Sequence, residues 1–161
     1  MEMSGAVRKL LNEAAITTEP QALGAPVSGT PLRMVLLGDN KGQFQVVCRR
    51  ADLFDLVGLN KQMGRQFRLV PRPESVRLLK QAGLRELPAV PALTGWPTML
   101  DRQAGQSDPV VIEPVGEDAR LTLTQTDFRK LAGSMEERAF CIPVSDIDAT
   151  PRPPERDQPV T

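Results

Sequence analysis

The side chains of this sequence that could do chemistry are its arginines and two cysteines, because histidine is absent. Without an imidazole the chain cannot build a Ser-His-Asp triad, a Cys-His dyad or a zinc site with a histidine ligand. Cys48 and Cys141 are too few for a four-thiolate metal site or a disulfide framework. We interpret both as buried side chains of a protein in a reducing cytosol, and we expect neither a metal nor a cofactor.

The arginines are concentrated in the middle of the chain. Arginine outnumbers lysine by 15 to 5, and the formal net charge is zero. Residues 49–85 nevertheless carry nine cations and three anions, whereas the chain from residue 101 onward carries seven cations and 12 anions. The guanidinium group suits bidentate contacts with phosphate, so Arg65, Arg68 and Arg72 are candidates for binding a nucleic-acid backbone. The alternative is that they are solvated faces of amphipathic helices.

The first half of the chain must position these groups on a hairpin and two helices. Ser4 is a plausible N-cap for a helix over 5–15. Strands over 32–37 and 43–48 flank a turn rich in glycine, aspartate and asparagine, which predicts a hairpin. Asp52 is expected to cap a helix that ends at Gly64.

A short strand over 67–70 is expected next, followed by a helix that Pro73-Glu74 opens, that turns Val76 inward and that Gly83 ends. Residues 87–95 form a proline-rich loop without periodicity. The remaining elements are strand candidates over 98–100, 110–115 and 120–124, then a helix that starts at Thr124 or Thr126 and ends at Gly133.

This order of elements predicts one α+β domain over residues 1–135. Residues 143–161 hold five prolines and few bulky apolar side chains, which is typical of a disordered tail or linker. The aliphatic runs are too short to span a bilayer, and the first residues lack the apolar run of a signal peptide. We therefore expect a cytoplasmic protein that does not enter a membrane.

Five stretches in this order resemble one known family. They are LRMVLLGD, ADLFDLVGLNKQMG, FRLVPRPESVRLLKQAG, WPTMLD and LTLTQTDFRKL, and they fall between residues 1 and 133. Together they resemble the YbaK/prolyl-tRNA synthetase-associated domain family. The resemblance implies a mixed, mostly antiparallel sheet with packed helices, and an aminoacyl-tRNA editing deacylase, a hydrolase that serves translation fidelity by cleaving the ester of mischarged tRNA without a metal.

The sequence departs from the family at both parts of the implied catalytic site. The family's lysine at the start of the first hairpin strand corresponds to Thr30, and Arg33 is the nearest cation. Residues 30 and 33 differ by an odd number, so on one strand their side chains face opposite sides. The family's Gly-x-x-x-Pro loop corresponds to residues 87–91, where Leu87 replaces the glycine and Pro88 lacks an N–H group.

The resemblance implies an aminoacyl pocket. Its candidate residues lie at the lysine position, in the loop over 87–91 and at the end of the strand over 98–100. Asp101 could orient this pocket or cap a turn, and Trp96 could stack on a base or anchor the loop. The implied tRNA backbone contacts are the arginines Arg65, Arg68 and Arg72. The candidate substrate-binding residues are Thr30, Arg33, Leu87, Pro88, Ala89, Val90, Pro91 and Asp101.

Two functions therefore compete. The first is a catalytically weakened editing enzyme. The second is a binding or regulatory module that recognises tRNA, an aminoacyl-like small molecule or a protein partner. Some bacterial relatives of this type are joined to a C-terminal HDOD signalling domain, and the proline-rich end here would suit such a linker.

Overall fold

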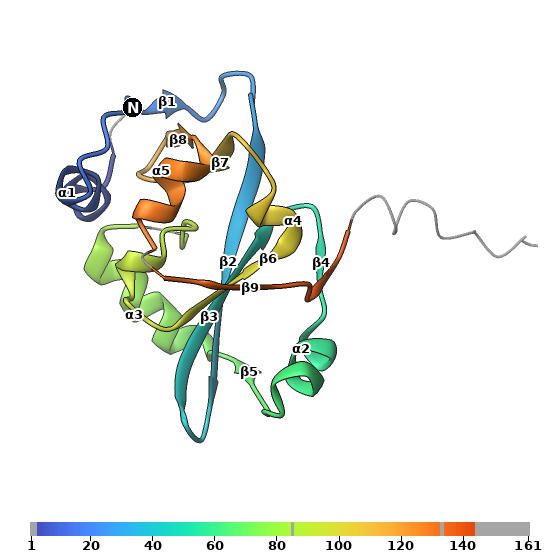
Figure 1. The fold of residues 1–161 in the computed structure, drawn as a ribbon. Coiled ribbons are helices and arrows are strands. Elements are labelled where there is room, and N and C mark those ends of the chain that lie inside the picture. Colours follow the sequence, from blue (N-terminus) through green and yellow to red (C-terminus); the bar gives the residue numbers. More distant parts are fainter. Residues whose placement is uncertain (1–2, 85, 133, 144–161) are drawn as a thin grey trace, which may run out of the picture.

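The two longest strands form a hairpin at the centre of the sheet (Figure 1). In this computed structural model, which describes residues 3–84, 86–132 and 134–143, β2 (Thr30–Asp39) pairs antiparallel with β3 (Gly42–Arg49). Only Asn40 and Lys41 lie between the paired ends, and Gly42 has a φ of 141°. The predicted hairpin is confirmed.

Seven strands follow one another across the main sheet in the order β1-β8-β7-β2-β3-β6-β9, and β5 pairs with β2 beside this path. The pairs β2/β7, β3/β6 and β6/β9 are parallel and the others are antiparallel. The predicted α+β class with a mixed, mostly antiparallel sheet is confirmed. The remaining strands of this sheet are β1 (Gln21–Ala22), β5 (Arg68–Leu69), β6 (Thr98–Asp101), β7 (Val110–Ile112), β8 (Ala119–Leu123) and β9 (Glu136–Arg138).

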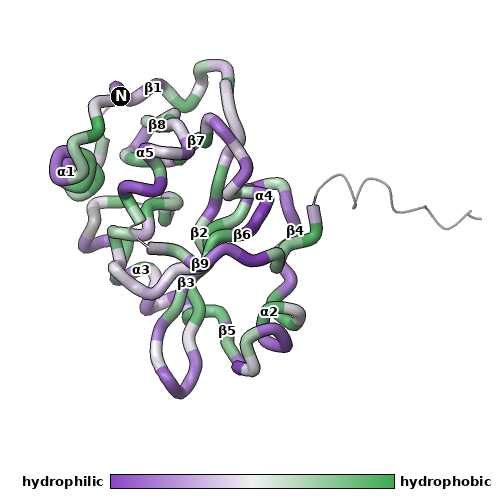
Figure 2. Tube along the Cα trace, viewed as in Figure 1, coloured by the Kyte–Doolittle hydropathy of each residue, from purple (hydrophilic) through white to green (hydrophobic). Residues whose placement is uncertain are grey.

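Alternating side chains of the hairpin supply two hydrophobic cores, one on each face of the sheet. Leu32, Met34 and Leu36 belong to the first core, with α1 (Gly5–Glu13), α5 (Gln125–Lys130) and, at its margin, α3 (Arg72–Ala82). Leu37, Phe44 and Cys48 belong to the second, which α2 (Leu56–Met63) covers. Figure 2 shows hydrophobic residues along the central strands and hydrophilic ones at the tip of the hairpin.

The predicted N-cap at Asp52 is wrong. The side chain of Asp55 caps α2 instead, accepting a hydrogen bond from the N–H of Gly58 at 2.9 Å. Residues Leu53–Phe54 form β4, which pairs with β10 (Cys141–Ile142) and therefore stays extended. The carboxylate of Asp52 is buried and binds Arg49. The predicted end of this helix at Gly64, which has a left-handed conformation, is confirmed.

The helix α3 begins at Arg72, with Pro71 at the N-cap position, and ends at Gly83 as predicted. Val76 was expected to face inward but is exposed, because the helix instead presents Leu78 to the first core.

The second half of the described chain holds elements that the sequence did not predict. They are the short helix α4 (Arg102–Gly105), one 3-10 turn η1 (Pro91–Leu93) within the predicted loop, and the strands β9 and β10, which follow residue 135. Thr124 caps α5 as expected. The helix α5 ends at Lys130 with Leu131 at the C-cap position, earlier than the predicted end at Gly133. Residues 144–161 lie outside the described residues, so the expected tail stays a prediction. None of the described helices has the length and apolar character needed to cross a membrane.

Candidate functional site

Thr30 lies at the first position of β2, on the face of the sheet that carries the first core. Its side chain is half-buried and has the same alternation phase as Leu32, and its N–H donates to the carbonyl of Pro109 at 3.0 Å. Ala89 and Val90 of the loop belong to the same core. The structure therefore brings Thr30 and the loop over 87–91 to one face of the sheet.

The backbone of the loop is turned inward and bonded to itself. Pro88, Ala89, Val90 and Pro91 are buried, and Leu87 is half-buried against the first core. The N–H of Val90 donates to the carbonyl of Pro88 at 2.7 Å, and neither proline has an N–H to offer. The Val90 amide is thus used within the loop and is not turned toward a ligand.

A buried glutamine holds this loop in place, and the sequence analysis missed it. Gln45 of β3 is fully buried. Its Nε2 donates to the carbonyl of Pro91 at 3.0 Å and to Oγ1 of Thr98 at 2.8 Å, and its Oε1 accepts from Oγ1 of Thr94 at 2.7 Å. The only available signal was that residue 45 alternates in phase with the buried Val47. A polar side chain at a core position calls for partners, which this loop supplies.

A charged cleft of about 210 Å³ opens at the same end of the sheet. Arg50 follows β3 there, where its N–H donates to the carbonyl of Pro31 at 2.8 Å and its guanidinium donates to the carbonyl of Glu113 at 2.9 Å. Arg50 and Glu86 have exposed side chains, one of each sign. The residues that line the cleft are Leu23, Arg50, Glu86, Glu113, Pro114 and Arg120.

The second arginine of the cleft is already neutralised. Arg120 is 4% exposed, and its guanidinium donates to the carbonyls of Leu23 and Ala25. Its Nε lies 2.9 Å from Oε2 of Glu113, an ion-pair contact whose angles fall outside those of a hydrogen bond. Arg50 and Glu86 are therefore the charged side chains most available to a ligand.

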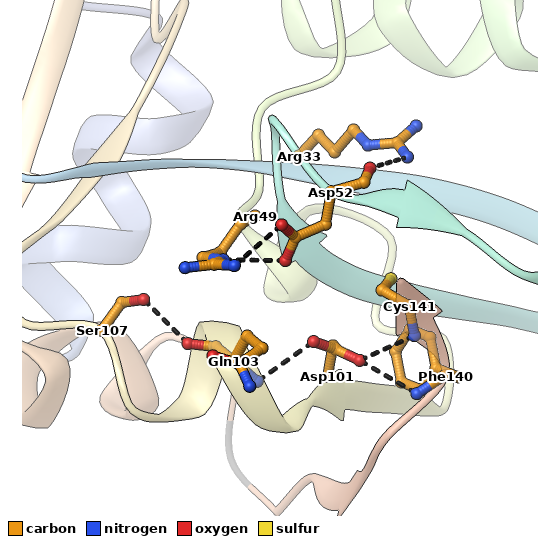
Figure 3. A network of polar contacts seen from close by, with 8 residues as sticks. All are labelled: Arg33, Arg49, Asp52, Asp101, Gln103, Ser107, Phe140 and Cys141. Atoms are coloured by element: carbon orange, nitrogen blue, oxygen red, sulfur yellow. Dashed lines mark hydrogen bonds and ion pairs between the residues drawn. The ribbon is translucent and has the colours of Figure 1, made fainter. Parts of the chain in front are cut away.

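Arg33 and Asp101 lie away from the loop. Arg33 faces the second core, as the alternation predicted, and its guanidinium donates to the carbonyl of Asp52 at 3.1 Å (Figure 3). Asp101 is buried, caps α4 through the N–H of Gln103, and accepts from the N–H groups of residues 140 and 141 at 3.0 Å each. The capping interpretation of Asp101 is the one that this geometry supports.

The candidate tRNA-binding arginines lie near the tip of the hairpin. Arg65 makes two hydrogen bonds of 2.7 and 2.6 Å with Asp39 and lies over the ring of Phe67 at 4.3 Å. Hydrogen bonding from Arg65 lowers the pKa of Asp39 to about 2. Arg65 and Arg68 line an open cleft of about 920 Å³, whereas Arg72, which is exposed, does not line it.

Trp96 is half-buried against the first core, which favours its interpretation as a loop anchor. Among the described residues, no group of three or more side chains of the types that bind metal ions is assembled.

The known proteins that are similar to this chain are solved structures. No family model and no curated protein matches the chain. A protein from Marinobacter aquaeolei VT8, named provisionally for signal transduction, is 39% identical over 91% of this chain with a TM-score of 0.82. The present chain covers 32% of that protein's length.

Two further solved structures have the same fold at low identity. One is a provisionally named trans-editing enzyme for prolyl-tRNA synthetase, 17% identical with a TM-score of 0.64, which covers 88% of this chain and 99% of its own. The other is a hypothetical protein, 16% identical with a TM-score of 0.65, which covers 84% of this chain and 99% of its own. The chain thus has the fold of a protein named for tRNA editing, and it is most similar in sequence, among these three, to one part of a longer protein named for signalling.

Proposed function

We propose that this chain is a regulatory binding module with the fold of an aminoacyl-tRNA editing domain, whose hydrolytic activity is lost or strongly reduced. The observation that carries the proposal combines two features of the site. Thr30 stands at the position of the family's lysine, and the Val90 amide of the loop donates its hydrogen bond within the loop. A preorganised donor that meets developing negative charge contributes about 3 kcal/mol, or roughly 100- to 1,000-fold in rate. Two such contributions are missing here.

The charged cleft favours a small zwitterionic ligand, such as a free amino acid. Arg50 offers a guanidinium for a carboxylate, and Glu86 offers a carboxylate for an ammonium group. The cleft's 210 Å³ equals the volume of about seven liquid waters, below the ~300 Å³ at which drug-sized pockets begin. A cleft of this volume can hold a free amino acid.

The similarity to part of a longer protein named for signal transduction supports the regulatory side of the proposal. In such a protein, binding of a ligand to this module would change the activity of another domain. The editing side is supported only by fold, since the prolyl-tRNA synthetase trans-editing structure is 17% identical.

Hydrolysis is tested by single-turnover deacylation of tRNAs that are mischarged with cysteine, alanine or serine. We expect the natural protein to leave these esters intact over the time in which an active editing domain would clear them. The variant Thr30→Lys with Leu87→Gly should raise the rate, provided that its circular dichroism matches the parent. Rapid hydrolysis by the natural protein would overturn the proposal and restore the editing enzyme.

Ligand binding is tested separately by calorimetry with each protein amino acid in turn. We expect at least one to bind, and we expect Arg50→Gln and Glu86→Gln each to weaken that binding at least tenfold. Arg77→Gln is the matched control, because Arg77 is an exposed arginine on α3 outside the cleft. Failure of every amino acid to bind would remove the zwitterion from the proposal, whatever the outcome of the deacylation assay.

A further inference from the structure

The two cysteines of the chain meet on the face of the sheet opposite the loop. Cys48 of β3 is fully buried in the second core, and Cys141 of β10 is half-buried against the same core. Both are free thiols, and both side chains pack in the same hydrophobic core. They come from positions far apart in the sequence, so the fold alone brings them together.

Backbone pairing fixes both thiols in place. Val47 pairs with Leu100 in the parallel β3/β6 ladder, so Cys48 lies next to Asp101 at the end of β6. The carboxylate of Asp101 accepts the N–H of Cys141 (Figure 3). Cys141 also pairs with Phe54 of β4. Cys141 is therefore held by two separate backbone contacts rather than by its thiol.

A cation lies beside the sulfurs. Arg33 pairs directly with Cys48 across the hairpin, so the two side chains share one face. The Nε of Arg33 is buried and finds no hydrogen-bond partner within the part of the chain that the structure describes. The carboxylates of Asp52 and Asp101 also face this region, but Asp52 is bound to Arg49 and Asp101 to backbone N–H groups. Of these charges, only that of Asp52 is paired with an ionised side chain, so the cation of Arg33 stays beside the sulfurs.

We propose that Cys48 and Cys141 form a reversible intramolecular disulfide in response to hydrogen peroxide, which covalently ties β10 to the central hairpin. The thiolate of the more accessible Cys141 attacks one peroxide oxygen; the O–O bond breaks, and a sulfenic acid forms as hydroxide leaves. The thiolate of Cys48 then attacks that sulfur, forming the S–S bond and breaking the S–O bond. The two thiol protons convert both hydroxides to water, so two thiols and one peroxide give one disulfide and two waters.

The electrostatics favour Cys48 as the second nucleophile, whereas Cys141 takes the first role because it is the more accessible thiol. The hydrogen bond from the Cys141 thiol lowers the pKa of Cys48, with burial acting in the opposite direction and Arg33 in the same one. The same contact raises the pKa of Cys141, and burial adds to that effect. The first step is therefore slow and depends on access to Cys141, whereas the second has its nucleophile in the same core.

The test is to add peroxide in equimolar amount to the full chain and to count thiols after denaturation. We expect both thiols to disappear together, the intact mass to fall by two hydrogens, and a dithiol reductant to restore both thiols. Peptide mapping without reduction should recover the Cys48 and Cys141 peptides as one linked species.

Two single variants separate the roles. Cys48→Ala should stop at a sulfenic acid on Cys141 that dimedone traps, and Cys141→Ser should leave Cys48 reduced, because Cys48 is 0% exposed. If Cys48→Ala does not fold, the natural protein and Cys141→Ser still decide the question. Disulfides between two chains, or a Cys141 oxidised beyond the sulfenic state while Cys48 stays reduced in the natural protein, would overturn the proposal.

Discussion

Replacing Gln45 by methionine tests whether this side chain holds the candidate loop. Methionine has a similar length and no hydrogen-bonding group of comparable strength, so the change removes the polar contacts while it fills the space. Gln45 makes three hydrogen bonds of 3.0 Å or shorter, to the carbonyl of Pro91 and the hydroxyls of Thr94 and Thr98. At about 1 kcal/mol each, their loss should lower the free energy of unfolding by about 3 kcal/mol.

Two of the three partners keep another hydrogen bond when Gln45 is replaced. The full desolvation penalty of an unsatisfied polar group therefore does not apply to them. The carbonyl of Pro91 also accepts from the N–H of Gly95 at 3.1 Å, and the hydroxyl of Thr98 also donates to the carbonyl of Trp96 at 2.8 Å. These contacts keep the expected loss near 3 kcal/mol rather than well above it.

Urea denaturation measures this loss. With an m-value of about 1.5 kcal/mol/M, a loss of about 3 kcal/mol moves the midpoint down by about 2 M without changing the slope. Gln43→Met is the matched control, since Gln43 lies on the same strand, is exposed and donates to Glu74; it should cost less than about 0.5 kcal/mol. A midpoint shift below about 0.7 M for Gln45→Met would refute the reasoning, because the loop would then be held by its apolar contacts alone.

Three further predictions concern the charged groups. Because hydrogen bonding from Arg65 lowers the pKa of Asp39 from 3.8 to about 2, this pair stabilises the fold above pH 4 and loses its effect as the pH falls toward 2; Asp39→Asn should flatten the acid unfolding curve over this range. Asp101→Ala should lower the urea midpoint more than Asp101→Asn, because asparagine keeps one oxygen for the two N–H groups next to β10 and loses only the cap of α4. If Arg65, Arg68 and Arg72 contact phosphates, tRNA binding in filter assays should weaken steeply with salt and vanish when all three become Glu, whereas salt-independent binding would contradict the contact.

Sequence patterns predicted the elements whose signals are local. The hairpin follows from two apolar runs around a short polar turn, and Gly64 and Gly83 end their helices where left-handed backbone is needed. Alternation also predicted that Thr30 and Arg33 point to opposite faces. Each of these features depends on residues only a few positions apart.

The features that sequence did not predict depend on distant partners. Asp52 and Asp55 are equally good capping residues by type, and the choice between them is made by β10, which holds the residues between them extended. The strand β9 has the sequence Glu-Glu-Arg, without apolar alternation. Nothing in this local sequence therefore indicates its parallel pairing with β6. The partners of Gln45 lie 46 to 53 positions further along the chain, beyond the reach of any periodicity.

The order of strands in the sheet also sets the order in which the sheet can close as the chain is made. The β2/β3 hairpin needs only a two-residue loop, so it can form as soon as its own residues are free. The N-terminal strand β1 pairs residue 21 with residue 120, and the N–H of Ser4 donates to the carbonyl of Val115. Closing so long a loop is slow, and it cannot begin until that distant segment has been synthesised. The segment that holds α1 and β1 is therefore synthesised before its partners and is among the last parts of this domain to acquire native contacts, and until then the apolar face of α1 has no native core to cover.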